Sequence, residues 1–596
     1  MIKNIEKLFE SPLPSARSGA FFNAFSYPTK ISPESIAVYI AAMTKPGETV
    51  LDTFGGSGST GIAALLCEHP TDKMKQIAED LGVSPEWGVR NASIYEIGTY
   101  GSFAARTITS RLKAKVFKDA VDSFIKKAEN LISDYYKATD PDGKEGKIRH
   151  VIWSEILLCQ ACGCEINYFA NGVQRNPVKF KKTMVCPKCS MENNIEDMKF
   201  AAENYFDSIL QTECKRKKRV PVWIYGTTNG YNWDRAANEA DQEIIAEIET
   251  KPYQSEPKKI EWGELHRSGY HYGITHLHHF YTKRNYIVMD QLWKLTEEYD
   301  EHVRNALKLL LLSYNASHCT MMTRVVAKKG SKDFILTGSQ SGVLYISKLP
   351  VEKNILLGLQ RKAKPIYEAF RLLENCKGTV EVHNKTSQNL EEKEKSVRLV
   401  FTDPPFGDFI PYAEVNQINE LWLENQTNRD EEIIISDSQK KDIDEYRKML
   451  TKVFLEIKRV LSDDAFAIVI FHAAKAQIWE AFECVINDAG LRVQATNILN
   501  KEQASFKQTV SEGSVQGDPL LLLGKCNTNS RLNENTQMLR QVINNMAGNA
   551  EFNERRVYSL YINECLAKNV RVAYSAKEAY VIMRAMREEI MNGKQH

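Results

Sequence analysis

The chain lacks long hydrophobic runs and carries almost no net charge. Its longer apolar stretches, such as residues 36–43 and 465–471, are far shorter than the roughly 20 residues that cross a bilayer. It begins MIKNIEKLFE, without the apolar core of a secretion signal. We therefore expect a soluble cytoplasmic protein with no membrane partner. The net charge is +2, so affinity for a polyanion has to come from local basic patches.

Internal repeats, low-complexity tracts and nuclease or helicase motifs are also missing. With 596 residues and 43% hydrophobic content, the chain is expected to form two or three domains with sizeable cores. Its 12 cysteines are not expected to form a disulfide framework, because cytoplasmic thiols stay reduced.

The first positive signal is a glycine-rich turn between an apolar strand and a helix. Residues 47–52 (GETVLD) predict the strand, and the TGIAALL segment that follows the turn predicts the helix. Gly55, Gly56 and Gly58 allow positive φ angles and close approach of a ligand, and the helix N-terminus favours a negative group such as a carboxylate. The turn lacks the Lys-Ser/Thr ending of a P-loop and the full G-x-G-x-x-G spacing. The alternative is a tight turn needed only for packing.

The second signal follows another predicted strand, residues 397–401 (VRLVF). There the sequence continues Thr-Asp-Pro-Pro-Phe, at the strand end where open α/β sheets bind ligands. The rigid prolines remove amide donors, so Asp403 and the Pro404 carbonyl can each accept one N–H of an exocyclic amino group. Phe406, after Pro405, can stack on a base, a contact worth about 1–3 kcal/mol. The alternative is an ordinary turn that ends a buried strand.

Two C-x2-C hooks predict a structural zinc site. Cys159 and Cys162 form the first hook, and Cys186 and Cys189 form the second after 23 intervening residues. Two such hooks supply the four sulfurs of a closed tetrahedral site. An iron–sulfur cluster is the rival interpretation, and Cys164 is a spare thiol or an alternative ligand.

Two further segments are rich in histidine or basic residues. A histidine-aromatic segment contains His266, His271, His276, His278 and His279. No carboxylate lies in helical register with these histidines, so we favour a DNA-contact or substrate-channel loop over a metal site. The residues expected to matter in that loop are Phe280, Lys283 and Arg284. The predicted DNA-binding run is Lys215, Arg216, Lys217, Lys218 and Arg219, and a second basic group contains Arg175, Lys179, Lys181 and Lys182. For both basic groups the alternative is a solvated surface.

Together these motifs resemble the amino-methylating, S-adenosylmethionine-dependent DNA methyltransferases, and among them the adenine-specific DNA methylases with a zinc ribbon. The F-x-G-x-G pattern is present as Phe54, Gly56 and Gly58, and the D-P-P-Y/F pattern as residues 403–406. Asp-Pro-Pro is similar to the adenine N6 version, whereas N4-cytosine enzymes more often carry Ser-Pro-Pro. Residues 25–40 resemble the segment that closes over the donor's methionine end.

The resemblance implies a fold and a set of site residues. The implied fold is a Rossmann-like class I methyltransferase, an α/β doubly wound sheet, with a large zinc-ribbon insertion and a helical C-terminal appendage. The implied cofactor-binding residues are Tyr27, Pro28, Asp52, Phe54, Gly55, Gly56, Gly58 and Glu96. The implied catalytic residues are Asp403, Pro404, Pro405 and Phe406. Glu96 would bind the donor's ribose hydroxyls, although it could also be a solvated acid at a strand end.

The sequence departs from the family pattern at two places. Asp52-Thr53-Phe54 stands where relatives show Asp-Pro-Phe. The family's acid before the catalytic strand is missing from residues 382–387, where Asn384 and Ser387 are the polar substitutes.

Motif order predicts four regions. They are residues 1–145 with the cofactor motifs, 146–370 as the inserted target-recognition region, 371–526 with the catalytic loop, and 527–596 as the appendage. Predicted strands cover residues 378–384 and 465–472, and predicted helices cover 286–313, 443–461 and 477–489.

The predicted reaction is methyl transfer to N6 of an adenine that is flipped out of double-stranded DNA, with Phe406 and Tyr412 stacking on the base. The resemblance also implies a restriction-modification or phage-defence setting with separate partner subunits. Alternatives are an RNA or tRNA base methylase, an N4-cytosine DNA enzyme, and a non-catalytic zinc-ribbon DNA-binding subunit.

Overall fold

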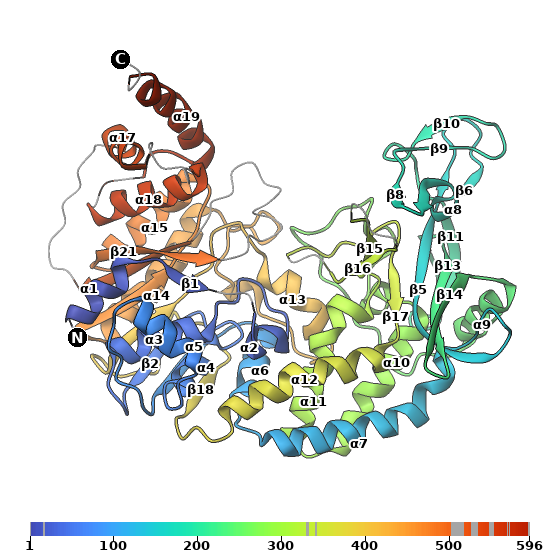
Figure 1. Cartoon of the computed structure of the whole chain (residues 1–596), viewed down its shortest axis with the longest axis horizontal. Coiled ribbons are helices and arrows are strands. Elements are labelled where there is room, and N and C mark those ends of the chain that lie inside the picture. The colour runs from blue at the N-terminus through green and yellow to red at the C-terminus, as the bar shows by residue number, and fades with distance from the viewer. Residues whose placement is uncertain are drawn as a thin grey trace. The chain divides into compact units, whose positions relative to one another are not determined.

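The computed structural model describes residues 2–15, 18–328, 333–339, 342–501, 518–525, 535–546, 553–568, 570 and 572–593. The chain divides into two compact units (Figure 1). Unit 1 contains Met1–Lys113, Glu368–Asn416 and Asn425–His596, and unit 2 contains Ala114–Tyr367 and Gln417–Glu424. In the part of the chain that is described, no helix has the length and apolar character needed to cross a membrane.

Unit 1 is built on an eight-stranded sheet with the order β1-β21-β22-β20-β19-β2-β3-β18. The strands are β1 (Leu13–Ser15), β2 (Thr49–Asp52), β3 (Asn91–Tyr95), β18 (Val380–His383), β19 (Val397–Thr402), β20 (Leu461–Ile470), β21 (Leu491–Lys501) and β22 (Asp518–Lys525). From β18 to β20 all neighbours are parallel. Only β22 runs antiparallel to its neighbours β20 and β21. A mostly parallel central sheet is compatible with the predicted methyltransferase fold.

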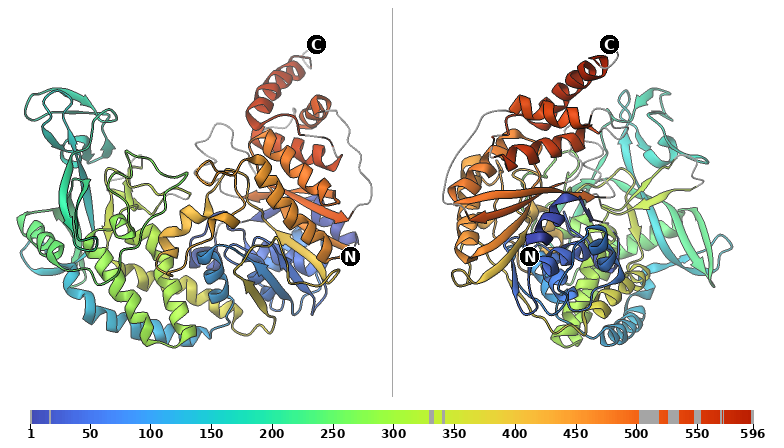
Figure 2. Two further views of the ribbon diagram at one scale, coloured as in Figure 1. Left: turned by 180° about the vertical axis from the view of Figure 1, so that it is seen from behind. Right: turned by 60° about the vertical axis from the view of Figure 1, so that its left-hand side comes forward.

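Helices cover both faces of this sheet because its central strands are apolar on both sides. Val400 of β19 is buried in a cluster with side chains of α14 (Ile443–Val460) and α15 (Ala476–Asp488). The next residue, Phe401, points to the opposite face and meets the ring of Tyr39 in α3 (Pro33–Met43) edge-on. Figure 2 shows the N-terminal helices in blue and the C-terminal helices in orange and red on opposite sides of the strands. The sheet is doubly wound.

The position of β2 creates a topological switch point in the sheet. After β2 the chain continues to β3 and β18 on one side of it, whereas β19 and β20 lie on its other side. The carboxyl ends of β2 and β19 therefore meet at a switch point, where α/β sheets bind ligands.

Several predicted elements coincide with observed ones. The strands predicted at residues 47–52, 378–384, 397–401 and 465–472 overlap β2, β18, β19 and β20, and the helices predicted at 443–461 and 477–489 overlap α14 and α15. The single helix predicted at 286–313 is instead two helices, α10 (Lys283–Leu295) and α11 (Glu301–Tyr314). The break occurs because the Asp300 side chain accepts the Val303 amide and caps a new helix.

Unit 2 contains a second, antiparallel sheet with the order β14-β13-β5-β17. The strands on this path are β5 (Glu145–Leu158), β13 (Arg219–Thr228), β14 (Tyr231–Ala236) and β17 (Val351–Lys353). Two further strands of the sheet, β4 (Lys137–Thr139) and β6 (Glu165–Asn167), also pair with β5. Unit 2 begins at Ala114 rather than at the predicted residue 146, because α7 (Ala114–Ile132) packs on α10 and α11.

Two segments of the chain do not fall into the regions that the sequence predicts for them. The C-terminal helices are α17 (Asn535–Met546), α18 (Glu554–Ala567) and α19 (Ala576–Gly593). They belong to unit 1, and residues such as Tyr561 and Ile562 share the core of α14 and α15, so they are not a separate appendage. Helix α13 (Tyr412–Glu420) begins in unit 1 but ends in unit 2.

Candidate functional site

The glycine-rich loop after β2 leads into helix α4 (Ser59–Leu66). Gly56 and Gly58 have φ angles of 51° and 86°, which favour glycine. A Cβ on Gly58 would lie 2.9 Å from the Cβ of Ala105 in α6 (Thr99–Ile108), so this glycine lets α4 and α6 pack closely. A Cβ on Gly56 would lie 3.1 Å from the ring of Tyr27. The loop thus serves both packing and close approach to the predicted cofactor segment.

Asp52 joins this loop to the end of β19. Its Oδ1 accepts hydrogen bonds from the Phe54 amide (3.0 Å) and the Thr402 hydroxyl (2.8 Å), and its Oδ2 accepts one from the Thr60 hydroxyl (2.6 Å). The hydroxyls of Thr53 and Thr402 also lie 3.0 Å apart. Burial raises the pKa of Asp52 to about 6, although these hydrogen bonds oppose the shift.

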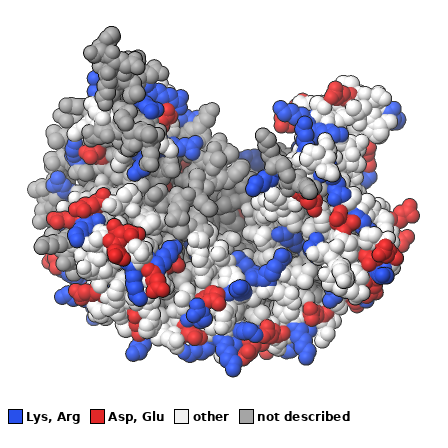
Figure 3. Space-filling view, viewed as in Figure 1, with Lys and Arg blue, Asp and Glu red and all other residues white. Residues whose placement is uncertain are grey.

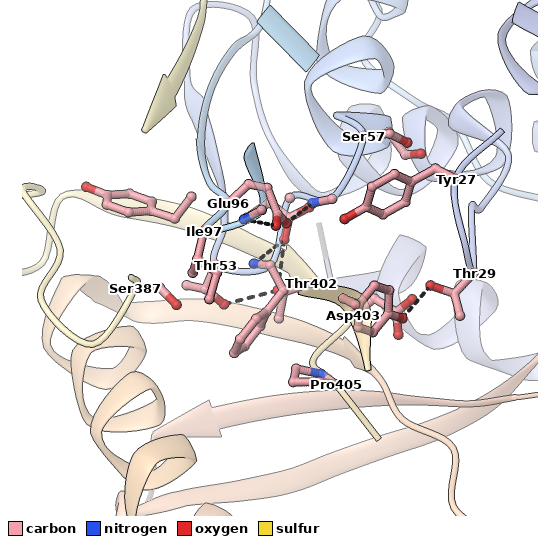
Figure 4. Close-up of a pocket in the computed structure, with 18 of the residues that line it drawn as sticks. Tyr27, Thr29, Thr53, Ser57, Glu96, Ile97, Ser387, Thr402, Asp403 and Pro405 are labelled. Carbon is pink, nitrogen blue, oxygen red and sulfur yellow. Dashed lines mark hydrogen bonds between the residues drawn. The ribbon is translucent and has the colours of Figure 1, made fainter. Parts of the chain in front are cut away.

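Glu96 follows β3 and is held by two backbone amides. Its Oε2 accepts from the Gly56 amide (2.7 Å), and its Oε1 accepts from the Gly98 amide (2.6 Å). A carboxylate oxygen can accept more than one hydrogen bond, and Glu96 also lines the cavity described next. Figure 4 shows Tyr27, Glu96 and Asp403 around one space, although they come from different elements.

That space is a cavity within unit 1, and most predicted site residues line it. The lining includes Tyr27, Pro28, Asp52, Phe54, Gly55, Gly56, Glu96, Asp403, Pro405 and Tyr412. Gly58, Pro404 and Phe406 are not among the described residues that line it. The motif at residues 402–406 therefore contributes its acid and its second proline directly, whereas its aromatic ring lies elsewhere.

Phe406 is buried beneath the loop that follows β19, with only 7% of its surface exposed. Its ring meets Phe471 edge-on, with centroids 5.6 Å apart, and lies near the rings of Phe409 and His472. This placement corrects the prediction that Phe406 stacks on a base. The loop is further anchored by the Pro405 carbonyl, which accepts the Tyr446 hydroxyl at 2.7 Å.

Tyr27 and Tyr412 are two of the aromatic residues that line the cavity. Their centroids lie 6.3 Å apart and their planes differ by 25°. The Tyr412 hydroxyl lies 3.0 Å from the Thr29 hydroxyl, and burial raises its pKa. Tyr412 was expected to contact nucleic acid, and its position at the cavity is consistent with a contact to the reacting base.

Some lining residues carry no sequence signature. Thr427, Glu431, Glu432 and Ile433 line the cavity, although NRDEEII is typical of a solvated loop. The buried Glu432 carboxylate accepts the Ala413 amide (3.0 Å) and the Gln439 side-chain amide (2.7 Å). The only sequence feature that could have indicated burial here is the apolar residues that follow this acidic run.

The region that lacks the family's acid also approaches the cavity. Thr386 and Ser387 line it. Asn384 instead donates to the backbone carbonyls of Glu96 (2.9 Å) and Ile97 (3.0 Å). Of the two polar substitutes, Ser387 is therefore placed to contact a ligand, whereas Asn384 holds the loop after β3.

The four hook cysteines gather in unit 2 as a sulfur cluster that could hold a metal ion. The Cys159 and Cys189 sulfurs lie 3.6 Å apart, as do those of Cys162 and Cys186. Backbone amides of Cys162 and Ala161 lower the pKa of the Cys159 thiol, which favours the thiolate that metals bind. Cys164 is not one of the four clustered sulfurs found among the described residues.

The histidine segment forms a second cluster around Asp207, the last residue of β11 (Ala202–Asp207). His278 Nε2 and His279 Nε2 lie 2.8 and 2.9 Å from Asp207 Oδ2. The three residues could hold a metal by proximity, but His279 Nδ1 accepts the Thr275 amide at 3.1 Å. A neutral His279 then carries its proton on Nε2 and donates to Asp207, which favours a hydrogen-bonded carboxylate over a metal site. Burial would raise the pKa of Asp207, but the histidine bonds hold it below its ordinary value.

The basic run at residues 215–219 is largely neutralised by acids. Lys217, which is buried, and Arg219, which is partly buried, both pair with Glu155, at 3.3 and 2.8 Å. Arg216 pairs with Glu203 and Glu249, and Lys218 pairs with Glu165. Lys215 is exposed. The run is therefore not the continuous cationic surface that the sequence predicts.

Phe280, Lys283 and Arg284 are buried as well. Lys283 Nζ donates to the Glu249 carbonyl at 2.6 Å, and the Arg284 guanidinium lies 3.6 Å from Glu352 Oε2. Both cationic groups therefore make contacts inside unit 2. The sequence predicts a DNA-contact or substrate-channel loop here, and the burial of these three residues does not fit a contact with DNA.

Comparison with known families supports a DNA methyltransferase. Residues 3–69 match a family model described as DNA methylase, which covers both N6 and N4 enzymes. A search of curated proteins found no match. The matched segment contains Tyr27 and the whole glycine-rich loop, but not Glu96. Such a family uses S-adenosylmethionine and acts on DNA. The match does not distinguish adenine N6 from cytosine N4 as the target.

Proposed function

We propose that this chain transfers a methyl group from S-adenosylmethionine to the exocyclic N6 of an adenine flipped out of double-stranded DNA. One observation carries the proposal. The glycine-rich loop after β2 and Asp403 after β19 line a single cavity, and Asp52 hydrogen-bonds to both segments. A donor and an acceptor bound there would be close neighbours, and proximity is the main catalytic contribution that such a reaction needs.

The donor half of the cavity has groups that suit S-adenosylmethionine, which supplies the electrophilic methyl group when bound. The Glu96 carboxylate is rigidly held and can accept ribose hydroxyls. Tyr27 and Pro28 line the same cavity and would cover the methionine end. Ser387 offers a hydroxyl toward the donor's adenine in place of the missing acid.

The acceptor half depends on Asp403 and the Pro404 carbonyl. Each would accept one N–H of the target amino group, which would turn the nitrogen lone pair toward the donor. Flipping the base out of the duplex costs a few kcal/mol. With Phe406 buried, we assign the offsetting ring contact to Tyr412 or Tyr27. The Asp-Pro-Pro sequence favours adenine over cytosine as the target.

We further propose that the four hook cysteines hold one structural Zn2+. Four thiolates leave no open position, so this metal would stabilise unit 2 rather than take part in the reaction. The biological setting that we propose is restriction-modification or phage defence. Any cleaving subunit would be a separate protein, because the sequence carries no nuclease motif.

The central test is Asp403→Ala. We expect loss of methyl transfer, because the target amine loses its acceptor, whereas donor binding measured by calorimetry should persist. Asp408→Ala is the matched control, since Asp408 is an exposed acid five residues away that pairs with Lys475. Full activity of Asp403→Ala would remove Asp403 from the mechanism.

The acceptor is tested by following labelled methyl groups into duplex DNA and total RNA. Expression in a methylation-free host, followed by genome-wide mapping of modified bases, should reveal N6-methyladenine in a defined sequence. Modification of cytosine N4 or of RNA alone would replace the proposed substrate. Donor binding without any transfer would favour a non-catalytic role.

A further inference from the structure

The zinc-ribbon hairpins carry a run of basic residues with no acid among them. Residues 172–191 contain five basic and no acidic side chains. The five are Arg175, Lys179, Lys181, Lys182 and Lys188. In a chain whose net charge is only +2, this segment is locally positive, although Glu192, Glu196 and Asp197 follow it directly and Glu192 lies opposite Val185 in the hairpin.

This segment is held in a defined conformation by short hairpins and a small core. Strand β7 (Val173–Arg175) pairs with β8 (Val178–Phe180), and β9 (Thr183–Val185) pairs with β10 (Glu192–Asn194). The Lys181 amide donates to the Gly172 carbonyl, and the Ile195 amide donates to the Lys182 carbonyl, both at 2.9 Å. Met184, Cys186 and Ile195 belong to a buried cluster beneath the hairpins. The lysines therefore project from a fixed scaffold.

Four of the five cations are free of acidic partners. Lys179, Lys181, Lys182 and Lys188 are exposed, and within the described part of the chain none of them forms an ion pair with a carboxylate. Lys181 Nζ donates to the Asn171 carbonyl at 3.1 Å. Their state contrasts with the neutralised run at residues 215–219.

Arg175 differs from the four lysines. Its guanidinium lies 3.5 Å from the Trp223 ring centroid and pairs with Asp234 at 3.1 Å. We therefore leave it out and define the ribbon patch as Lys179, Lys181, Lys182 and Lys188, together with two exposed apolar residues, Val185 and Met191. Figure 3 shows basic side chains in blue along the edges of the lobe that carries the ribbon.

The apolar members of the patch lie at the same hairpin as the metal hook. The exposed fractions of Val185 and Met191 are 55% and 47%, and the Cys186 amide donates to the Met191 carbonyl at 2.8 Å. Exposed apolar side chains among unpaired lysines suit a polyanion that also offers apolar surface. Duplex DNA offers phosphates for the lysines, and sugars and groove walls for the apolar pair.

We infer that the ribbon patch is a DNA-binding surface that contacts the phosphate backbone of the duplex. This inference rests on the proposed function, which supplies duplex DNA as the partner. It moves the expected nucleic-acid contacts away from residues 215–219 and 283–284 to a set of residues that the structure leaves exposed and unpaired. Because phosphate contacts carry little sequence information, the patch would supply affinity and orientation rather than base selection.

The test uses the full-length chain with Lys179, Lys181, Lys182 and Lys188 all changed to Gln. Binding to a duplex oligonucleotide is measured by fluorescence anisotropy over a range of salt concentrations. Each lost phosphate contact should reduce the slope of log K against log salt by about 0.9. We expect a fall in slope of about 2 to 4, and affinity about tenfold lower or more at physiological salt.

A matched control removes the same charge elsewhere in unit 2. Lys115, Lys126, Lys144 and Lys147 are exposed, and changing all four to Gln should affect the slope much less. Equal effects in both variants would mean that only net charge matters, and an unchanged slope in the patch variant would also overturn the inference. Preference for RNA over duplex DNA in the wild type would overturn the choice of partner.

Two measurements separate a failed inference from a failed fold or function. Zinc content of the patch variant should equal that of the wild type, which shows an intact ribbon, and donor binding should be unchanged. If Asp403→Ala abolishes methylation but the patch variant binds DNA normally, the proposed function stands and the ribbon patch alone is refuted.

Discussion

A departure from the family pattern at one residue has a structural explanation. Thr53 stands where the methyltransferase pattern that the sequence resembles carries proline, and its hydroxyl lies 3.0 Å from that of Thr402. Both residues are buried and line the cavity. A proline could not make this bond, so the departure adds a link between the cofactor loop and the strand that leads into Asp403.

We expect Thr402→Val to reduce kcat by about tenfold while changing donor affinity less. The variant keeps the shape of the side chain but leaves Asp52 without one donor, at a cost of about 1–3 kcal/mol, and loosens the residue before Asp403. Steady-state kinetics and donor calorimetry check this. Thr402→Ser restores the hydroxyl and should restore most of the rate; a Val variant as fast as the wild type would contradict the role.

Asp52 predicts a pH dependence of stability. Its pKa of about 6 lies above that of an unfolded aspartate, about 4, so the folded chain binds the proton more tightly. The contribution of Asp52 to stability is therefore full below about pH 4 and is lost as pH rises through about 6. Asp52→Asn cannot titrate, so its Tm relative to the wild type should rise over this interval and then level off. A Tm difference that does not vary with pH would contradict the shift.

The sequence predicts which residues form the cavity better than how each side chain points. The glycine loop, Glu96 and Asp403 could be recognised because strand ends and fixed spacing bring them to the switch point. The orientation of Phe406 could not, because it depends on Phe471 and His472, which reach it only after β20 packs beside β19. Glu432 had no signature, since its burial depends on the Ala413 and Gln439 amides.

At the scale of elements, apolar runs predict strands well, whereas charge runs mislead. Residues 215–219 were predicted as a basic surface, but residues 212–217 form β12 (Thr212–Lys217), which pairs with β11. In that register Arg216 lies opposite Glu203 and bonds to it at 2.7 Å. Cross-strand pairing of opposite charges is a property of the folded sheet, and composition alone does not reveal it.

The ribbon provides a prediction at this scale. Purified protein should carry about one zinc, and Cys186→Ser should lower zinc content and make the hairpins at residues 173–194 susceptible to proteolysis, because the site loses a quarter of its ligands. Metal analysis and limited proteolysis measure both effects. Cys164→Ser is the control and should keep the metal. Iron with a visible absorption band, or no metal, would refute the zinc assignment.

At the scale of the molecule, the C-terminal helices belong to the main core of unit 1. The composition change after residue 527 suggests a separate appendage, but Tyr558, Tyr561 and Ile562 of α18 are buried with side chains of α14 and α15. The sequence could not reveal this, because polar residues on the outer faces of these helices mask their apolar stripes.

We expect Ile562→Ala to destabilise unit 1 by about 2–5 kcal/mol, the range for a fully buried large-to-small change. Urea unfolding measures the loss, and donor binding should fail at a lower urea concentration than in the wild type. Glu564→Ala changes an exposed residue of the same helix and should shift stability by less than about 0.5 kcal/mol. Equal stability of the Ile562 variant and the wild type would indicate a separately folding C-terminal region.

The division of the chain has a consequence for how unit 2 could be exchanged by recombination. Unit 2 is encoded mainly by one block between β3 and β18, but it also includes Gln417–Glu424, which follow the catalytic loop. Within unit 2, Asn315 donates to the Ile418 carbonyl and the Asn419 side chain, and Trp422 donates to Tyr281. Recombination that exchanged only the large block would replace the residues at positions 281 and 315 but keep the original residues 417–424 that they contact. Successful exchange therefore requires two separate gene segments to be inherited together.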